Sequence, residues 1–335
     1  MAAAQAAIVR LFRKTQRPTL SPALPPQGGG SALLTPAEIT ALAAQARLLA
    51  RLPQRREVHD HHAGDWPSAR LGRGLDFEES RPYAPGDDIR DMDWRTTARL
   101  SHLYVKTYRE ERQPVLHLVV DRGPAMRFGT RRRLKATQAA RLAALVAFAA
   151  AERNAAVSAS FWEAQDHDLP PAHGRHAALA IARAAAAPCP PLPPRGRGGG
   201  ATPANPPAQE HRLARLAADL PRGARVLLLT DLSWLEDRHA PALARLGERC
   251  DVQVLQIVDA AERALPDIGL AQVLDLARAR PRWLDTRASA AAHAQAFQAR
   301  QEYLTGLLAR AGIAHRLVGA EEEALLPCLT LENHA

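Results

Sequence analysis

Two groups of residues in this sequence have types and positions that could carry chemistry: aspartates at the ends of apolar segments, and one histidine-rich cluster. Asp121, Asp231 and Asp259 each follow directly after a segment that we predict to be a strand. The carboxyl ends of parallel strands meet at one edge of an open α/β sheet, where the functional crevice of such folds lies. His59-Asp60-His61-His62 offers imidazole and carboxylate groups, which suit divalent transition metals.

Neither group comes with the sequence signature of a common catalytic centre. The chain contains no G-x-x-x-x-G-K-[ST], G-x-S-x-G or H-E-x-x-H motif, the usual signatures of P-loop nucleotide hydrolases, serine hydrolases and zincins. Four adjacent residues cannot all face one ion without an unusual turn. We therefore expect that the protein is not an enzyme. A metal-dependent hydrolase that uses His59, Asp60, His61, Asp87 and Asp88 stays open as the least favoured alternative.

Length and composition indicate a soluble globular protein. The chain has 335 residues, 47% of them hydrophobic and 24% charged, which is enough to bury a sizeable core. No uninterrupted apolar run reaches the roughly 18 residues of a membrane-spanning helix. Cys189, Cys250 and Cys328 are widely spaced and odd in number, which argues against a disulfide framework or a zinc site and for a reducing compartment. We expect a cytoplasmic location.

The formal net charge of +9 is compatible with an acidic partner, such as nucleic acid, an anionic membrane face or an acidic protein surface. The arginine clusters lack interleaved aromatic side chains on which bases could stack, so nucleic-acid binding is only an alternative here. One basic cluster follows the first core strand and could receive an acidic partner surface or form a solvated helix start. Cations at a helix N-terminus are unfavourable and need another reason. The cluster comprises Arg122, Arg127, Arg131, Arg132, Arg133 and Lys135.

The spacing of apolar residues predicts strands and helices that alternate along the chain. Strands are expected at 103–108, 115–120, 157–162, 225–230, 251–258 and 314–318, with a short hairpin at 272–276 and 282–285. Helices are expected at 36–52, where Thr35 and Glu38 have capping-box spacing, and at 132–153, 173–186, 209–220, 239–249 and 288–311. This alternation indicates an α/β fold with a parallel sheet covered on both faces.

The segment at 72–106, here called the signature segment, is rich in charged and turn-forming residues. Pro85-Gly86-Asp87 is typical of a tight turn. Arginines interleaved with acids are expected to form guanidinium–carboxylate pairs that lock an irregular loop, with Phe77, Tyr83 and Trp94 as its anchors. A structural role is favoured over a catalytic one, because the nearby arginines leave little reason for raised carboxyl pKa values. The residues singled out are Asp76, Phe77, Arg81, Tyr83, Gly86, Asp87, Asp88, Arg90, Asp93, Trp94 and Arg99.

Residues 72–99 read G-x-G-x-D-F-x-x-x-R-x-Y-x-P-G-D-D-x-R-x-x-D-W-x-x-x-A-R. This pattern resembles the signature of the domain of unknown function 58 family, bacterial proteins that contain a von Willebrand factor A-like domain. Further matches lie at Asp121, Lys135, Thr230-Asp231-Leu232, and Asp259 with Glu262, so that the likeness covers about residues 55–320. The resemblance implies a parallel-sheet, Rossmann-like α/β domain.

A von Willebrand factor A domain normally holds Mg²⁺ through D-x-S-x-S after its first strand, with a Thr and an Asp from later loops, and an acidic residue of a partner completes the coordination. Here the motif reads Asp121-Arg122-Gly123-Pro124-Ala125, so both hydroxyl positions lack an oxygen. Asp231 matches the later Asp, and Thr202 is a candidate for the Thr. The resemblance implies a degenerate adhesion site without metal or other cofactor, whose partner-binding positions are Asp121, Arg122, Gly123, Ala125, Thr202 and Asp231.

The family resemblance also implies a partner. Its members resemble proteins that act with MoxR-type AAA+ ATPases in the maturation or remodelling of other proteins. We therefore expect a non-catalytic interaction module that binds such an ATPase or its client protein through the crevice near Asp121 and Asp231.

Four regions are expected along the chain. Residues 1–34 form a flexible basic tail, and 35–110 hold an N-terminal helix and the signature segment with short strands. Residues 111–320 form the von Willebrand factor A-like domain, and 321–335 a C-terminal tail. The Pro- and Gly-rich stretch at 188–207 is expected to be a flexible loop inside the domain.

Overall fold

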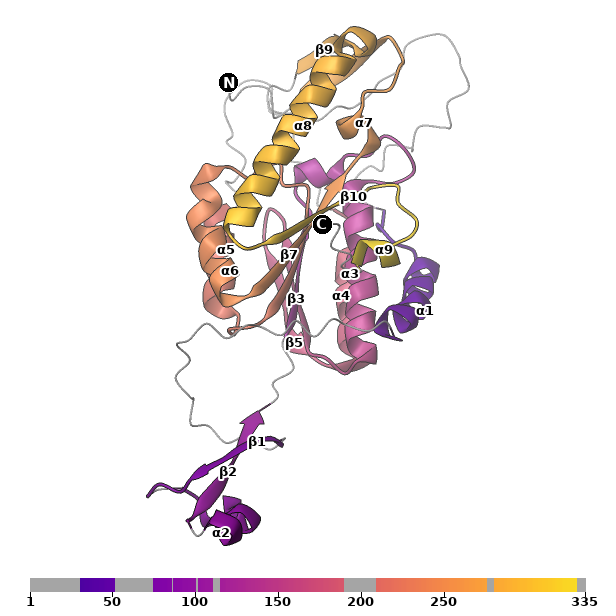
Figure 1. Ribbon diagram of the computed structural model, residues 1–335. Coiled ribbons are helices and arrows are strands. Elements are labelled where there is room, and N and C mark those ends of the chain that lie inside the picture. Colours follow the sequence, from indigo (N-terminus) through magenta and orange to yellow (C-terminus); the bar gives the residue numbers. More distant parts are fainter. Residues whose placement is uncertain are drawn as a thin grey trace. The chain divides into compact units, whose positions relative to one another are not determined.

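The computed structural model describes residues 31–51, 75–85, 87–100, 102–110, 115–189, 209–275 and 280–329. The chain divides into two units, one formed by residues 1–52 and 114–335 and the other by residues 53–113. Figure 1 shows the helices and strands of both units. Several predictions concern residues outside this description: Gly86, Thr202, the cluster at 59–62, most of the tail at 1–34 and most of the loop at 188–207.

A six-stranded sheet forms the centre of the larger unit. Its strands are β3 (Leu116–Asp121), β4 (Val157–Trp162), β5 (His167–Ala172), β6 (Arg225–Thr230), β7 (Asp251–Val258) and β10 (Ala314–Gly319). They lie in the order β10-β7-β6-β3-β4-β5, and every pairing is parallel except that of β4 with β5. This is the strand order of a doubly wound α/β fold, which reverses between β3 and β6. The predicted α/β class is confirmed.

The edge strand β5 is absent from the sequence prediction. Its residues are mostly exposed, and they include Pro170 and Pro171, which lower the strand propensity. Proline is tolerated in a strand only at an edge, where its missing N–H leaves no neighbouring strand without a donor. The strand runs antiparallel to β4 because the four residues between them are too few for a crossover helix.

Helices cover both faces of this sheet (Figure 1). The helices α3 (Lys135–Glu152) and α4 (Gly174–Ala186) pack on one face, and α5 (Gln209–Asp219), α6 (Ala240–Arg249) and α8 (Thr286–Arg310) on the other. Successive side chains of β3 alternate between the two cores, since Leu118 and Val120 lie in the first and Val119 in the second. The alanine-rich α3 is buried along most of its length.

The first helix, α1 (Pro36–Arg51), packs against α3 and belongs to the larger unit rather than to the signature segment. The predicted capping box is present: the N–H of Thr35 donates to Glu38 Oε2 at 2.7 Å, and that of Glu38 to Thr35 Oγ1 at 3.2 Å. The expected boundaries at 35 and 111 therefore differ from those of the structure. The physical reason is the apolar face of α1, whose Leu42 and Ala46 are buried in the core over α3.

Both expected tails also contribute to this core. Leu33 and Leu34, placed in the tail at 1–34, are buried, and the N–H of Leu33 donates to the carbonyl of Ala186 at 2.7 Å. At the other end, the short helix α9 (Leu326–Leu329) lies in the expected tail at 321–335, and its Cys328 is buried. Apolar side chains at both ends thus extend the α/β unit beyond the predicted limits.

Smaller elements complete the description. The hairpin of β8 (Leu270–Asp275) and β9 (Arg280–Asp285) is confirmed, and α7 (Ala260–Arg263) follows β7. The other unit contains the antiparallel strands β1 (Leu75–Pro82) and β2 (Tyr104–Glu110) and the helix α2 (Trp94–Leu100). No helix within the described ranges is long and apolar enough to cross a membrane.

Substitution of two helical glycines tests the packing of α6 against the loop after α8, because Gly247 lies in this contact and Gly306 faces open space. A Cβ at Gly247 would lie 2.2 Å from the carbonyl oxygen of Ala311, whereas at Gly306 the nearest atom would be 4.0 Å away. We expect Gly247→Ala to lower the free energy of unfolding by about 1–3 kcal/mol, because the backbone must shift. Gly306→Ala, the matched control, should raise it by up to about 1 kcal/mol through helix propensity. Equal effects in urea denaturation would contradict this packing.

Candidate functional site

Asp121 and Asp231 lie at the carboxyl ends of the neighbouring strands β3 and β6, as the sequence predicts. Both are buried, with 4% and 8% of their surface exposed. Asp121 accepts hydrogen bonds from the hydroxyl of Thr230 at 2.6 Å and from the N–H of Gly123 at 2.8 Å. Burial and the nearby charge of Asp231 raise the pKa of Asp121 to about 6. One carboxylate oxygen thus joins β3 to the end of β6, and the other fixes the turn that follows β3.

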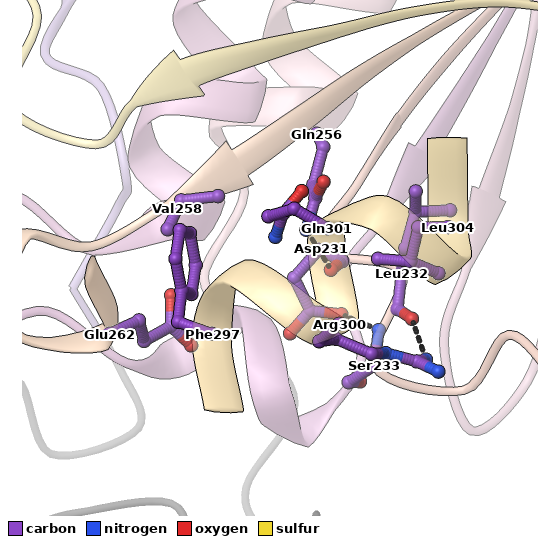
Figure 2. A pocket seen from close by; sticks show the side chains of 10 residues that line it. All are labelled: Asp231, Leu232, Ser233, Gln256, Val258, Glu262, Phe297, Arg300, Gln301 and Leu304. Carbon is purple, nitrogen blue, oxygen red and sulfur yellow. Dashed lines mark hydrogen bonds between the residues drawn. The ribbon is translucent and has the colours of Figure 1, made fainter. Parts of the chain in front are cut away.

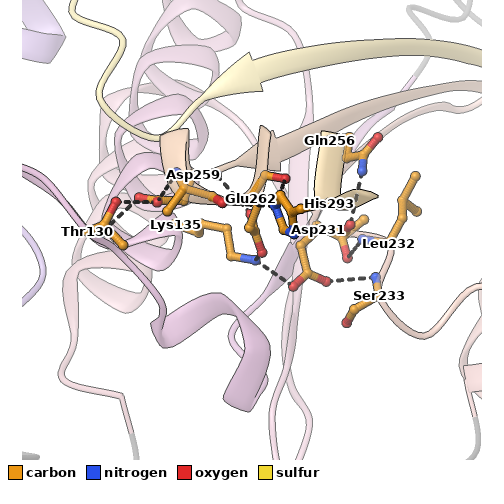
Figure 3. A network of polar contacts seen from close by, with 11 residues as sticks. Thr130, Lys135, Asp231, Leu232, Ser233, Gln256, Asp259, Glu262 and His293 are labelled. Atoms are coloured by element: carbon orange, nitrogen blue, oxygen red, sulfur yellow. Dashed lines mark hydrogen bonds and ion pairs between the residues drawn. The ribbon is translucent and has the colours of Figure 1, made fainter. Parts of the chain in front are cut away.

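Lys135 supplies a positive charge to this edge of the sheet. It is the first residue of α3 and is 1% exposed, and its Nζ donates to Asp231 Oδ2 at 2.9 Å and to Glu262 Oε1 at 2.7 Å (Figure 3). Burial opposes the charge on Lys135, but the two carboxylates outweigh it and raise its pKa above the ordinary value. The ammonium therefore stays charged and holds three elements together: α3, the loop after β6, and α7.

The two carboxylates respond differently to Lys135. Burial would raise the pKa of Asp231, but the ammonium and the N–H of Ser233, at 2.9 Å from Asp231 Oδ1, lower it below the usual range. Burial raises the pKa of Glu262, and Lys135 offsets this only in part. The side chain of Glu262 is 34% exposed, so this carboxylate forms the solvent-facing side of the network.

Asp259 fixes the loop that carries Glu262. It caps α7 by accepting from the N–H of Ala261 at 2.9 Å, while its own N–H donates to Glu262 Oε2 at 2.8 Å. Thr130 donates both its N–H and its hydroxyl to the same Asp259 carboxylate. The third predicted aspartate therefore lies at the expected edge, where it acts as a structural cap.

The residues around Asp121 do not fit the divalent cation that the resemblance implies for such a domain. Gly123 and Ala125 offer no side-chain oxygen, and a Cβ at Gly123 would lie 3.0 Å from Asp121 Oδ1. The ammonium of Lys135 already occupies Asp231 and would repel a second cation beside it. Among the described residues, no group of three or more His, Cys, Asp or Glu side chains is arranged to hold a metal ion.

Arg122 takes a different place from the one predicted. Its guanidinium is buried and donates to the carbonyls of Ala184 at 2.9 Å, Ala187 at 2.5 Å and Pro188 at 2.8 Å, at the C-terminus of α4. It also lies 2.9 Å from Glu163. Arg122 is therefore a helix cap that interacts favourably with the carbonyl end of α4, and its side chain is not available to a partner.

The expected basic cluster is likewise divided. Arg122 and Lys135 are buried in separate networks, and Arg132 and Arg133 pair with Glu323 near the C-terminal helix at 3.1 and 2.8 Å. These residues are neighbours in sequence but do not form one basic surface, because their side chains bind different groups of the same chain.

The signature segment contains part of the expected network of charged pairs. Arg81 donates to both carboxylate oxygens of Asp87, at 2.8 and 2.5 Å. Asp88 accepts from the N–H of Arg90 at 2.9 Å. Asp93 caps α2 through Thr96, and hydrogen bonds led by that from Ser80 hold its pKa well below the usual range.

The expected aromatic anchors are placed unevenly. Trp94 is 63% exposed and is not an anchor, because the position after Asp93 directs it outward at the start of α2. Tyr83 is half-buried and its N–H donates to the carbonyl of Leu103 at 2.8 Å. Phe77 pairs with Tyr108 and Asp76 with Arg109 in the β1–β2 register. Arg90 and Arg99 are exposed.

Reasoning from the sequence named Lys135 in the basic cluster and Glu262 as a family match, but it did not predict that the two pair with each other. One signal points to Lys135: a cation at the first position of a long helix opposes the helix dipole and calls for acidic partners. No local pattern connects it to Glu262, since 127 residues separate the two. Only the fold brings them together.

A family model described as "Protein of unknown function DUF58" matches residues 79–303. Two relatives, the uncharacterized protein Mb1516 of Mycobacterium bovis and the uncharacterized protein Rv1480 of Mycobacterium tuberculosis, are 42% identical to the chain over 73 residues. The matching part makes up 22% of this chain and 22% of each relative, so the chain spans about a fifth of the length of the curated relatives it matches.

The comparison with solved structures finds the conserved hypothetical protein BatB from Bacteroides thetaiotaomicron, with a TM-score of 0.39 and 12% identity over 64% of this chain and 95% of that chain. An aerotolerance-related membrane protein from Bacteroides fragilis has a TM-score of 0.36 and 13% identity over 61% and 91% of the chains. A von Willebrand factor type A protein from Catenulispora acidiphila has a TM-score of 0.28 and 16% identity over 46% and 35%.

The poor fit to a cation can be tested directly. We expect titration calorimetry with Mg²⁺ and Mn²⁺ to show no binding at millimolar concentrations, because Lys135 already neutralises Asp231 and two ligand positions have no oxygen. A heat of binding that disappears in Asp121→Ala would contradict this reading of the site.

The raised pKa of Asp121 predicts a pH dependence of stability. The folded protein retains this proton up to about pH 6, whereas an unfolded aspartate loses it near its ordinary value. Between these values the folded state binds more protons, so the contribution of Asp121 to stability falls as the pH rises, by up to about 3 kcal/mol. In urea denaturation, the stability of Asp121→Asn relative to wild type should therefore increase from pH 4 to pH 7.

Asp219→Asn, at an exposed position of α5, serves as the control for this measurement. A difference between wild type and Asp121→Asn that stays constant across the range would show that Asp121 titrates as a surface carboxyl does.

Proposed function

The chain belongs to the family of proteins of unknown function DUF58, and on that premise we propose that it is a non-catalytic protein-binding module of the von Willebrand factor A-like kind. It acts in the cytoplasm as an adaptor of a MoxR-type AAA+ ATPase in the maturation or remodelling of client proteins. Its docking surface is the carboxyl edge of the sheet around β3 and β6.

One observation carries this proposal: the ammonium of Lys135 between Asp231 and Glu262. In an adhesion site, a metal ion bridges the domain to an acidic group of the partner. Here a side chain of the chain itself provides the positive charge, at the same edge of a doubly wound sheet. Because Lys135 already neutralises the carboxylates at this edge of the sheet, binding of a partner there needs no metal ion.

The burial of the central residues determines which groups a partner would touch. Asp121, Asp231 and Lys135 are almost fully buried, so they shape the edge from beneath. Ser233 is exposed, and Glu262 is part-exposed beside it. We call the surface formed by Ser233, Glu262, Phe297 and Gln301 the edge surface (Figure 2); docking is expected there rather than directly on the aspartates.

Capture of a purified MoxR-type ATPase, encoded near this protein, tests the proposal. Wild type should retain the ATPase in the presence of a chelator. Ser233→Arg should weaken capture at least about tenfold, because it places a long charged side chain on the edge surface and leaves a partner group badly paired. Ala218→Arg is the matched control: it adds the same charge at an exposed position near the end of α5, where the chain turns into β6.

Three results would overturn the proposal: no capture by wild type, equal capture by both variants, or capture only with added Mg²⁺. Salt-sensitive binding of wild type to duplex DNA that both variants retain would favour the nucleic-acid alternative instead.

A further inference from the structure

The smaller unit of the chain carries exposed apolar side chains on and directly after α2. Among the described residues, eight large apolar side chains are exposed, and four of them lie within residues 89–103. Trp94, Leu100 and Leu103 have 63%, 45% and 48% of their surface exposed. Exposed apolar side chains that gather in one place mark interaction sites, whereas scattered ones need no explanation. The concentration of these residues therefore indicates a docking surface.

The apolar core of this unit is small. Among its described side chains, only Met92 and Val105 are both apolar and buried. The unit is built on the two-stranded sheet of β1 and β2, and a two-stranded hairpin is marginally stable unless it packs against another element. Burial of the side chains around α2 by a partner would therefore stabilise the unit as well as the complex.

The backbone brings the exposed side chains close to one another. The N–H of Asp93 donates to the carbonyl of Tyr104 at 2.8 Å. Trp94 follows Asp93 and Leu103 precedes Tyr104, so these two exposed side chains start from neighbouring points of the backbone. Leu100 ends α2, three residues before Leu103. Figure 1 shows α2 beside the hairpin of β1 and β2.

The helix α2 also carries positive charge that the protein does not neutralise. Arg95 and Arg99 lie one turn apart, and the helix contains no acidic residue. Both are exposed, and neither has an ion pair with any residue in the described ranges. Arg81 of the same unit, by contrast, pairs with Asp87. The two guanidinium groups of α2 are thus available to carboxylates of another molecule.

The charge and the side-chain types select one kind of occupant. A second copy of this chain would present the same arginines and be repelled. Single-stranded nucleic acid stacks its bases on successive aromatic side chains, whereas α2 offers Trp94 with leucines after it. Amphipathic helices that lie on membranes present a broad apolar face, and α2 has seven residues. A protein surface with an apolar hollow bordered by carboxylates fits all of these side chains.

We propose that Trp94, Arg95, Arg99, Leu100 and Leu103, here called the α2 patch, dock on an acidic surface of the partner protein. Trp94 enters an apolar hollow of that surface, and the two arginines pair with carboxylates at its border. Aromatic side chains and arginine are enriched at protein interfaces. This inference rests on the proposed function, because it adds a second contact with the partner that the edge surface receives.

Ile89 is exposed as well but is not part of the α2 patch. It lies between Asp88 and Asp91 in the segment before α2, where the nearby carboxylates would repel an acidic partner.

Capture of the purified MoxR-type ATPase by the full chain tests the role of Trp94. Trp94→Ala should weaken capture at least about tenfold, because a tryptophan that fills a pocket of the partner contributes a large share of the binding free energy. The melting temperature should not fall, because this side chain is mostly exposed. Trp283→Ala is the matched control, since Trp283 on β9 is 64% exposed and belongs to the other unit. Equal capture by both variants would overturn the proposal.

Charge reversal tests the two arginines. Arg95→Glu and Arg99→Glu should each weaken capture about tenfold at low salt, and less at about 1 M salt, where exposed charges are screened. Arg245→Glu makes the same change in net charge at an exposed position of α6 and serves as the control. A similar loss in Arg245→Glu would attribute the effect to net charge and contradict the assignment to α2.

A peptide probe tests the α2 patch without the ATPase. A synthetic helical peptide of leucines and glutamates should bind the full chain with a dissociation constant of about 0.1–1 mM. It should also shift the NMR signal of the Trp94 indole N–H, which is assigned from its loss in Trp94→Phe. The same peptide with lysines in place of the glutamates should bind at least about tenfold more weakly. Equal binding of the two peptides would overturn the proposal.

The two proposals can fail separately. Capture of the ATPase that is unchanged in Trp94→Ala would overturn the α2 patch and leave the adaptor function standing. Absence of capture by wild type would overturn the adaptor function, and the peptide titration would then decide on the α2 patch. Binding to single-stranded DNA or to phosphatidylglycerol vesicles that Trp94→Ala abolishes, with capture unchanged, would overturn the proposal in favour of that occupant.

Discussion

The ion pairs of Lys135 with Asp231 and Glu262 are the interaction on which the carboxyl edge of this protein depends. Each partner comes from a different element, so the ammonium joins the start of α3 to the loop after β6 and to α7. Removing Lys135 would leave the buried carboxylate of Asp231 without a cationic partner, at a cost of about 3–5 kcal/mol. The arrangement also compensates the positive end of α3 with two carboxylates. In a metal-dependent adhesion site a bound ion would hold such groups in place, whereas here the side chain of Lys135 does so.

The charged residues of the site are buried, whereas the residues above them are at least partly exposed, and this difference bears on function. The charged groups that define the site lie beneath the surface, where their positions do not depend on solvent or salt as those of surface charges do. Above them, Ser233, Glu262 and Gln301 are accessible and differ in chemistry. Such an arrangement suits recognition of another protein, because the buried ion pairs hold each accessible group in a defined position.

The sequence predicted the sheet, most helices and the meeting of Asp121 with Asp231, because buried strands show as apolar runs and their ends coincide in a parallel sheet. It misplaced α1 and Leu33, since an amphipathic helix does not reveal which core it covers. Arg122 and Lys135 looked like neighbours in one basic cluster, yet they bind groups 62 and 127 residues away. Such pairings depend on the folded topology, which local spacing does not encode.

The prolines of β5 have a consequence for how this protein meets others. Successive residues of a strand direct their N–H groups to opposite sides, so the adjacent Pro170 and Pro171 remove one donor from the outer side of β5, where an extended peptide would pair. This edge of the sheet is thereby a poorer template for β-augmentation and for self-assembly into larger sheets. A partner that approaches β5 would therefore rely more on side-chain contacts than on backbone hydrogen bonds. Aggregation by addition of strands is disfavoured at this edge.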